Sequence, residues 1–89
     1  MIAYMLSSIG MDRDLLANPK NVRFKDLLAV CVQAFGRPRI RGSHHIFKMP
    51  WPGDPRINIQ KDGALAKPYQ VRLVIKALEK LEADNDVKQ

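Results

Sequence analysis

The chain has 89 residues, with 15 Lys and Arg against 9 Asp and Glu, a formal net charge of +6 at pH 7, and a single cysteine. This length accommodates one small domain and excludes a large enclosed active site, because a chain of this size buries only about 60% of the surface that its unfolded form exposes. One cysteine excludes an internal disulfide and a Cys-rich zinc site, which favours a cytoplasmic protein. The basic charge is typical of proteins that bind polyanions, above all nucleic acid. A stabilising partner or self-association is consistent with so small a core.

The first 20 residues show no sustained periodicity. The apolar stretch 1–10 is far shorter than the roughly 20 residues that span a bilayer, and it lacks the basic start of a signal peptide. We therefore expect no membrane segment. A turn signal, Asn18-Pro19-Lys20-Asn21, follows this stretch. The chain is thus predicted to comprise an N-terminal extension (1–20), one folded domain (21–84) and a polar tail (85–89).

Apolar residues after Asn21 recur at intervals of three and four and predict an amphipathic helix. Asn21 is suited to cap its start, Gly36 to end it, and Pro38 to prevent its continuation. The predicted core stripe comprises Phe24, Leu27, Leu28, Cys31, Val32 and Phe35. Because Cys31 lies within this stripe, we interpret it as a small core residue rather than a nucleophile.

Three short extended segments follow, at 37–41, 44–49 and 56–60. Gly42-Ser43 suits a tight turn, the proline-rich stretch 50–55 forms a longer connection, and Asp62-Gly63 turns the chain. Each strand should be short, and strict alternation in 56–60 indicates a half-buried strand.

A second helix is predicted to begin at Pro68, whose missing N–H costs nothing at a helix start. Its apolar stripe comprises Val71, Val74, Ile75, Leu78 and Leu81, while Arg72, Lys76 and Lys80 form a separate basic stripe that we interpret as a solvated face. The element order predicts an α+β fold in which two helices pack on one face of a three-stranded antiparallel sheet. The other face then lies in solvent.

Strand alternation predicts what each face carries. Ile57, Ile59, Phe47 and Met49 should face the helices, and His45 should lie with them as a packed, hydrogen-bonded histidine. The solvent face should carry His44, Ile46, Lys48, Arg56, Asn58 and Gln60. An imidazole among cations can move protons beside a polyanion while the cations stabilise developing charge. Adjacent histidines point to opposite faces and no Cys or acidic cluster lies nearby, so we expect neither a metal nor another cofactor.

Three parts of the chain together resemble the HicA toxins of type II toxin–antitoxin systems. They are the run Arg-Gly-Ser-His-His-Ile-Phe-Lys at 41–48, the strand Arg-Ile-Asn-Ile at 56–59, and the helix entry Ala-Lys-Pro-Tyr-Gln-Val at 66–71. The resemblance extends from about residue 22 to about residue 81; compact members of the family begin close to the first helix, so the segment 1–20 is additional. It implies a fold like that of double-stranded-RNA-binding domains, ribosome-independent mRNA cleavage, and neutralisation by a HicB antitoxin.

The resemblance also implies that the Gly-Ser-His element carries the catalytic histidine, which is His44, with His45 as the fallback. On this interpretation the chain is a metal-independent endoribonuclease that cleaves single-stranded mRNA. His44 acts as general base on a ribose 2′-OH. Lys48 and Arg56 hold the phosphate, and the general acid is water or a lysine. Arg41, Ser43, Asn58 and Gln60 are expected to complete the RNA-binding surface.

Two other functions remain open from the residues alone. A non-catalytic RNA-binding module of the same fold needs only the basic surface. A protein-interaction domain would use the sheet face or edge to dock a partner, and its RNA affinity would depend little on salt.

Overall fold

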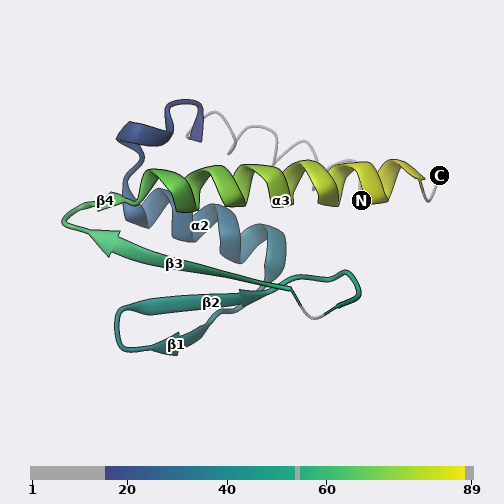
Figure 1. The fold of residues 1–89 in the computed structure, drawn as a ribbon, viewed down its shortest axis with the longest axis horizontal. Helices are drawn as coiled ribbons and strands as arrows, with labels where there is room; N and C mark the ends of the chain where they lie inside the picture. The colour runs from purple at the N-terminus through teal and green to yellow at the C-terminus, as the bar shows by residue number, and fades with distance from the viewer. Residues whose placement is uncertain (1–15, 54, 88–89) are drawn as a thin grey trace.

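A computed structural model describes residues 16–53 and 55–87 and shows an α+β fold, as predicted (Figure 1). Its four strands form one open antiparallel sheet in the order β1-β2-β3-β4. The elements are η2 (Pro19–Asn21), α2 (Phe24–Phe35), β1 (Arg39–Arg41), β2 (His44–Lys48), β3 (Arg56–Asp62), β4 (Leu65–Ala66) and α3 (Pro68–Val87). In this part of the chain, neither α2 nor α3 has the length and apolarity to cross a membrane. Most of the predicted N-terminal extension, residues 1–15, lies outside the described residues.

Helix α2 begins at Phe24, so the prediction that Asn21 caps it is wrong. The residue at the cap position is Arg23, without a side-chain bond. The Phe24 N–H instead donates to the Ala64 carbonyl at 3.0 Å, because a bridge between Arg23 and Leu65 joins the helix entry to β4. The helix ends as predicted at Gly36, whose φ of 90° favours glycine and whose N–H donates to the Val32 carbonyl at 2.9 Å.

The sheet has one strand more than the sequence predicted. Strand β3 continues to Asp62, and the chain turns at residues 63–64 so that Leu65 and Ala66 pair back onto its end. This pairing is only two residues long, which is too short for alternation to signal it. The Gly42-Ser43 turn between β1 and β2 is as predicted, with Arg41 opposite His44 beside it.

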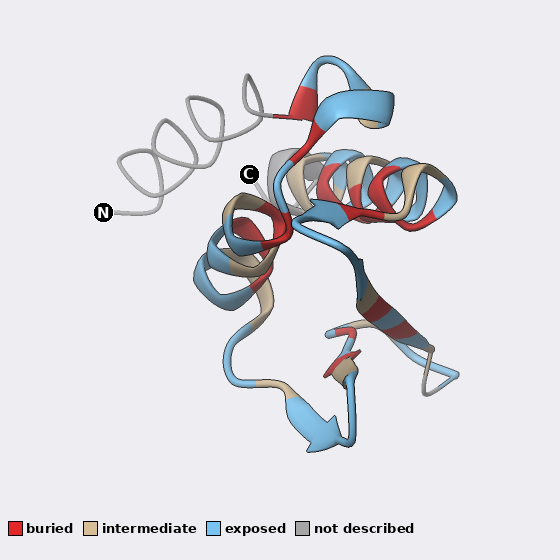
Figure 2. Ribbon diagram, turned by 90° about the vertical axis from the view of Figure 1, so that its left-hand side faces the viewer, coloured by how far each residue is buried: buried red, intermediate tan, exposed pale blue. Residues whose placement is uncertain are grey.

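The buried core fills the space between the helices and one face of β2 and β3 (Figure 2). Phe47, Met49, Ile57 and Ile59 are buried there, as strand alternation predicted. Helices α2 and α3 run above β3 in Figure 1, and both contact it. Leu16, which falls in the predicted N-terminal extension, is only 1% exposed and belongs to this core.

The helices differ in detail from their predicted stripes. On α2, Val32 is 41% exposed and Val30 is buried in its place, so the assignment of Val32 to the core is wrong. On α3, which begins at Pro68 as predicted, Val71, Val74 and Leu78 are buried. The α3 backbone continues to residue 87, into the segment predicted as a polar tail.

Candidate nucleic-acid interface

The face of the sheet that points away from the core is called the open face here. Register pairs Arg39 with Ile46 and Arg41 with His44 across β1–β2, and it pairs His44 with Gln60, Ile46 with Asn58 and Lys48 with Arg56 across β2–β3. Directly opposed residues share a face. The open face therefore comprises Arg39, Arg41, His44, Ile46, Lys48, Arg56, Asn58 and Gln60, all half-buried or exposed. It carries four cations and no acidic residue.

His44 is held on the open face by Asn58, its diagonal neighbour on β3. The His44 Nδ1 atom lies 3.0 Å from the Asn58 Nδ2 atom and 3.2 Å from Asn58 Oδ1. If Nδ1–H donates a hydrogen bond to Oδ1, the Nε2 lone pair is available to a substrate; if Nδ2 donates a hydrogen bond to Nδ1, Nε2 carries the proton. Among the described residues only Asn58 bonds to this ring. Rotation of the Asn58 side-chain amide by half a turn exchanges Oδ1 and Nδ2. This orientation therefore determines whether His44 Nε2 can accept or donate a proton.

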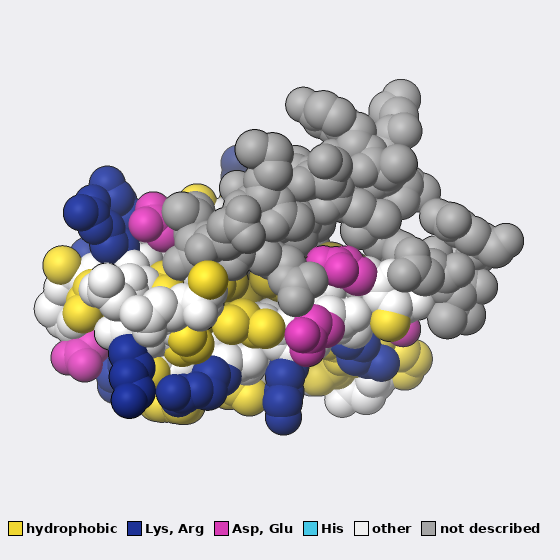
Figure 3. Space-filling view, turned by 90° about the horizontal axis from the view of Figure 1, so that it is seen from above, with side chains coloured by type: hydrophobic (Ala, Val, Ile, Leu, Met, Phe, Trp, Pro, Cys, Tyr) yellow, Lys and Arg dark blue, Asp and Glu magenta, His cyan; other side chains and the backbone are white. Residues whose placement is uncertain are grey.

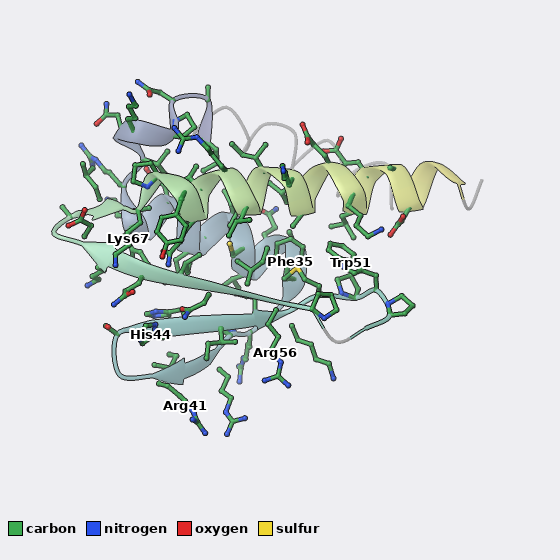
Figure 4. All side chains as sticks on the ribbon, in the orientation of Figure 1. Phe35, Arg41, His44, Trp51, Arg56 and Lys67 are labelled. Carbon is green, nitrogen blue, oxygen red and sulfur yellow. The ribbon has the colours of Figure 1, made fainter. Side chains whose placement is uncertain are left out.

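Gln60, directly opposite His44, connects the site to the turn and to α3. Its Nε2 donates to the Ser43 Oγ at 3.3 Å, and its Oε1 accepts a bond from the Lys67 Nζ at 3.2 Å. The Gln60 backbone N–H donates to the side chain of buried Gln70 at 2.9 Å. These bonds bring the Lys67 ammonium to the His44 end of the sheet, as Figure 4 shows.

The register separates the predicted phosphate-binding cations into two groups. Arg41 lies opposite His44, whereas Lys48 is four residues farther along β2 and pairs with Arg56. At about 3.3 Å per residue this places Lys48 about 13 Å from His44 along the strand. Figure 4 shows His44 and Arg56 toward opposite ends of the sheet. Among the described residues, Arg41 and Lys67 are therefore cations at the His44 end of the open face.

Sequence reasoning missed Lys67, Arg37 and Arg39. Lys67 reaches the site only through the turn at the end of β3, and no local pattern signals that contact. The two arginines did have a signal, because they precede Arg41 at two-residue steps and two-residue spacing defines one face of a strand.

His45, the fallback catalytic residue, lies on the opposite face of β2. Its ring packs edge-on against Phe24, with ring centroids 5.1 Å apart. Its buried Nδ1 has no hydrogen-bond partner among the described residues, so the expectation that His45 is packed holds, and the hydrogen bond expected for it is not found at this atom. The adjacent histidines thus point to opposite sides, and within the described part of the chain no three His, Cys, Asp or Glu side chains gather as a metal site would require.

The cations on the far side of the molecule have different surroundings. Viewed from above α3 in Figure 3, Lys and Arg side chains lie interspersed with acidic and apolar ones. Lys80, of the predicted basic stripe, lies 4.0 Å from an Asp84 carboxylate oxygen and 5.2 Å from the centre of the Trp51 ring. Such partners favour a structural role for Lys80.

Comparison of the chain with protein-family models, with curated proteins and with solved structures finds no match. The resemblance to the HicA toxins therefore rests on the three motifs alone. All three motifs supply side chains to the site: His44 and Ser43 come from the first, Asn58 from the second and Lys67 from the third.

Proposed function

We propose that the chain is a metal-independent endoribonuclease of the HicA type, with a fold like that of double-stranded-RNA-binding domains. The observation that carries the proposal is the position of His44. Its imidazole lies on a shallow cationic face, and Asn58 engages one ring nitrogen while the other has no partner among the described residues. The motif resemblance independently selects the same histidine.

The proposed reaction is an intramolecular displacement at phosphorus. His44 Nε2 accepts the proton of a ribose 2′-OH, the 2′-oxygen forms a bond to the adjacent phosphorus, and the bond from phosphorus to the 5′-oxygen breaks. The leaving 5′-oxygen takes a proton from water or from Lys67, which gives a 2′,3′-cyclic phosphate and a 5′-hydroxyl. Nε2 can accept a proton only while Nδ1 holds one, so the productive orientation is the one in which Asn58 Oδ1 accepts from Nδ1.

Charge stabilisation in this proposal comes from the cations at the His44 end. Arg41 and Lys67 are the candidates at that end to neutralise the charge that develops on the phosphate oxygens. General-base catalysis supplies roughly 10²–10⁴-fold, so positioning and charge must contribute the rest.

The test incubates purified protein with end-labelled single-stranded RNA in EDTA. The wild type should produce fragments that end in a cyclic phosphate, and an RNA with 2′-deoxyribose at the cleaved position should resist. His44→Ala should lose roughly 10²–10⁴-fold in rate, whereas His45→Ala, its matched control on the other face, should still cleave when folded. Cleavage by His44→Ala at the wild-type rate, or activity that needs an added metal ion, would reject the proposal.

We further infer that a separate, acidic antitoxin of the HicB type covers the open face. A shallow sheet surface suits a protein partner, for which a standard interface of roughly 1,600 Å² is sufficient. Among the described strands β1 pairs with β2 alone, so its outer edge is open to a partner strand; the 62% exposed Ile40 lies at this edge, on the same side as His45. Co-expression with the product of the adjacent reading frame should give a complex that melts higher than the free chain.

A non-catalytic RNA-binding module is the second candidate, favoured by the four open-face cations, which need no titrating group to bind a polyanion. It predicts salt-dependent RNA binding without product in the EDTA assay. The catalytic and non-catalytic proposals therefore separate in one experiment.

A further inference from the structure

A concavity lies on the open face at the end away from His44. Its volume is about 200 Å³, and it is lined by Arg37, Arg39, Ile46, Lys48 and Arg56. Arg39 faces Ile46 across β1–β2, Lys48 faces Arg56 across β2–β3, and Arg37 comes from the connection between α2 and β1. Four of the five lining residues are cations, and none is acidic.

Three cations of this cluster, Arg37, Arg39 and Lys48, are not neutralised within the described part of the chain. No ion pair or hydrogen bond joins the side chains of Arg37, Arg39 or Lys48 to any described residue. Cations gathered in this way repel one another and raise the local concentration of anions. Guanidinium groups also match phosphate oxygens with two parallel hydrogen bonds, which a lone lysine cannot provide. The chemistry of the cluster is that of a phosphate site.

The Lys48–Arg56 pair of the cluster is offset from His44 along the strands, and Arg39, opposite Ile46, lies between the two positions. Lys48 lies about 13 Å along β2 from His44, at about 3.3 Å per residue, so the two ends of the face offer separate positions along an extended strand. Half-buried Ile46 lies midway and presents an apolar surface between the two positions. A single extended polyanion can nevertheless contact both ends of the face.

We propose that Arg37, Arg39, Lys48 and Arg56 form a subsite for a second, non-scissile phosphate of the same RNA strand, an inference that rests on the proposed endoribonuclease function. Phosphate contacts fix the register of a nucleic acid without reading its sequence. The subsite anchors the strand so that one ribose 2′-OH lies at His44. The substrate class is therefore a single strand long enough to reach both ends of the open face, rather than a dinucleotide.

The test measures binding rather than cleavage. Fluorescent 2′-O-methyl oligonucleotides, which have no 2′-OH to react, are titrated in a series from dinucleotide to octanucleotide. Wild-type affinity should increase in a step at the length that reaches the subsite, and the step should disappear in Arg39→Gln/Lys48→Gln. The slope of log affinity against log salt should fall by about 1.4 in this variant, since each single-strand phosphate contact contributes roughly 0.7.

The matched control is Arg72→Gln/Lys76→Gln, which removes two exposed cations from α3. It should retain both the step and the salt slope. A smooth length dependence in the wild type, or equal losses in the two double variants, overturns the subsite. An Arg39→Gln/Lys48→Gln chain that binds RNA normally but loses the antitoxin also overturns it, and assigns the cluster to a protein. Binding with the expected step but without cleavage of ordinary RNA rejects the endoribonuclease instead.

Discussion

His44 and His45 are neighbours in the chain, yet they lie in opposite surroundings. His44 is half-buried on the open face, with Nδ1 bonded to Asn58 and cations on either side. His45 lies on the helix side, where its ring contacts Phe24 and its buried Nδ1 has no described partner. The same side-chain type therefore lies on an accessible face in one position and packs against the core side in the next.

The difference shows that a short strand can place its core residues on one face and its candidate site residues on the other. Successive residues of β2 alternate between the two faces, so the helix-side residues contribute the buried core, and in our proposal the open-face residues bind RNA. Substitutions at neighbouring positions should consequently have different effects. Four predictions follow this separation, from the largest effect to the smallest.

The pair Ile46 and Phe47 tests the separation most directly. Phe47 is 0% exposed in the core, so Phe47→Ala should lower the free energy of unfolding by about 3–5 kcal/mol. Ile46 is half-buried on the open face, and Ile46→Ala should cost about 1 kcal/mol. Urea denaturation of both variants measures the two losses. Equal losses would show that the open face is packed in solution.

Cys31 introduces a pH dependence on the buried side. Burial raises the pKa of its thiol from 9.0 to about 12, because the thiolate is poorly solvated in the core. The folded state thus holds the proton more tightly than the unfolded state. The resulting stability is fully present below pH 9 and is lost between pH 9 and about 12, at about 1.4 kcal/mol per pH unit. Urea denaturation at pH 8 and pH 10.5 should show a larger decrease for the wild type than for Cys31→Ala, and identical decreases would contradict the assignment.

Asn58 is predicted to act as a positioning residue through His44. Asn58→Ala should slow RNA cleavage about five- to tenfold, since it removes one hydrogen bond worth about 1–1.5 kcal/mol. Asn58→Asp retains an acceptor oxygen and should recover most of the rate. Single-turnover cleavage measures both, with thermal melting to confirm folding. If the aspartate variant is as slow as the alanine variant, the hydrogen bond does not orient the ring.

The unpartnered Nδ1 of His45 gives the smallest expected effect. His45→Leu removes a buried polar atom while it retains contact with Phe24, so stability should rise by about 1 kcal/mol. His44→Leu, the control on the open face, should give no gain. A loss of stability in His45→Leu would indicate that His45 has a hydrogen-bond partner in solution.

Alternation and helical periodicity predicted the faces of the main elements. The steps of two between Ile57 and Ile59, and of three and four along α3, are direct consequences of strand and helix geometry. Both isoleucines are buried as predicted. Periodicity was less decisive on α2, where both Val30 and Val32 are apolar and only tertiary packing selects Val30 for the core.

Register and tertiary partners could not be predicted. Alternation gives the face of Asn58 but not its distance from His44. That distance depends on the register in which β3 pairs with β2, and the length of the proline-rich connection does not specify this register. Lys67 reaches the site through a bond to Gln60, seven positions earlier in the chain. The start of α2 depends on β4, a strand of two residues. Each of these features is a contact between two segments, and the sequence pattern of neither segment indicates that contact.

The open edge of β1 also bears on how copies of this chain behave toward one another. An uncovered strand edge is a template for edge-to-edge aggregation, and the exposed Ile40 would add apolar contact to such pairing. Arg39 and Arg41 flank it, so two copies that meet at this edge would bring their arginines together. Like charges directly opposed disfavour that pairing. The arginines that we propose to contact RNA would therefore also oppose edge-to-edge pairing of free copies.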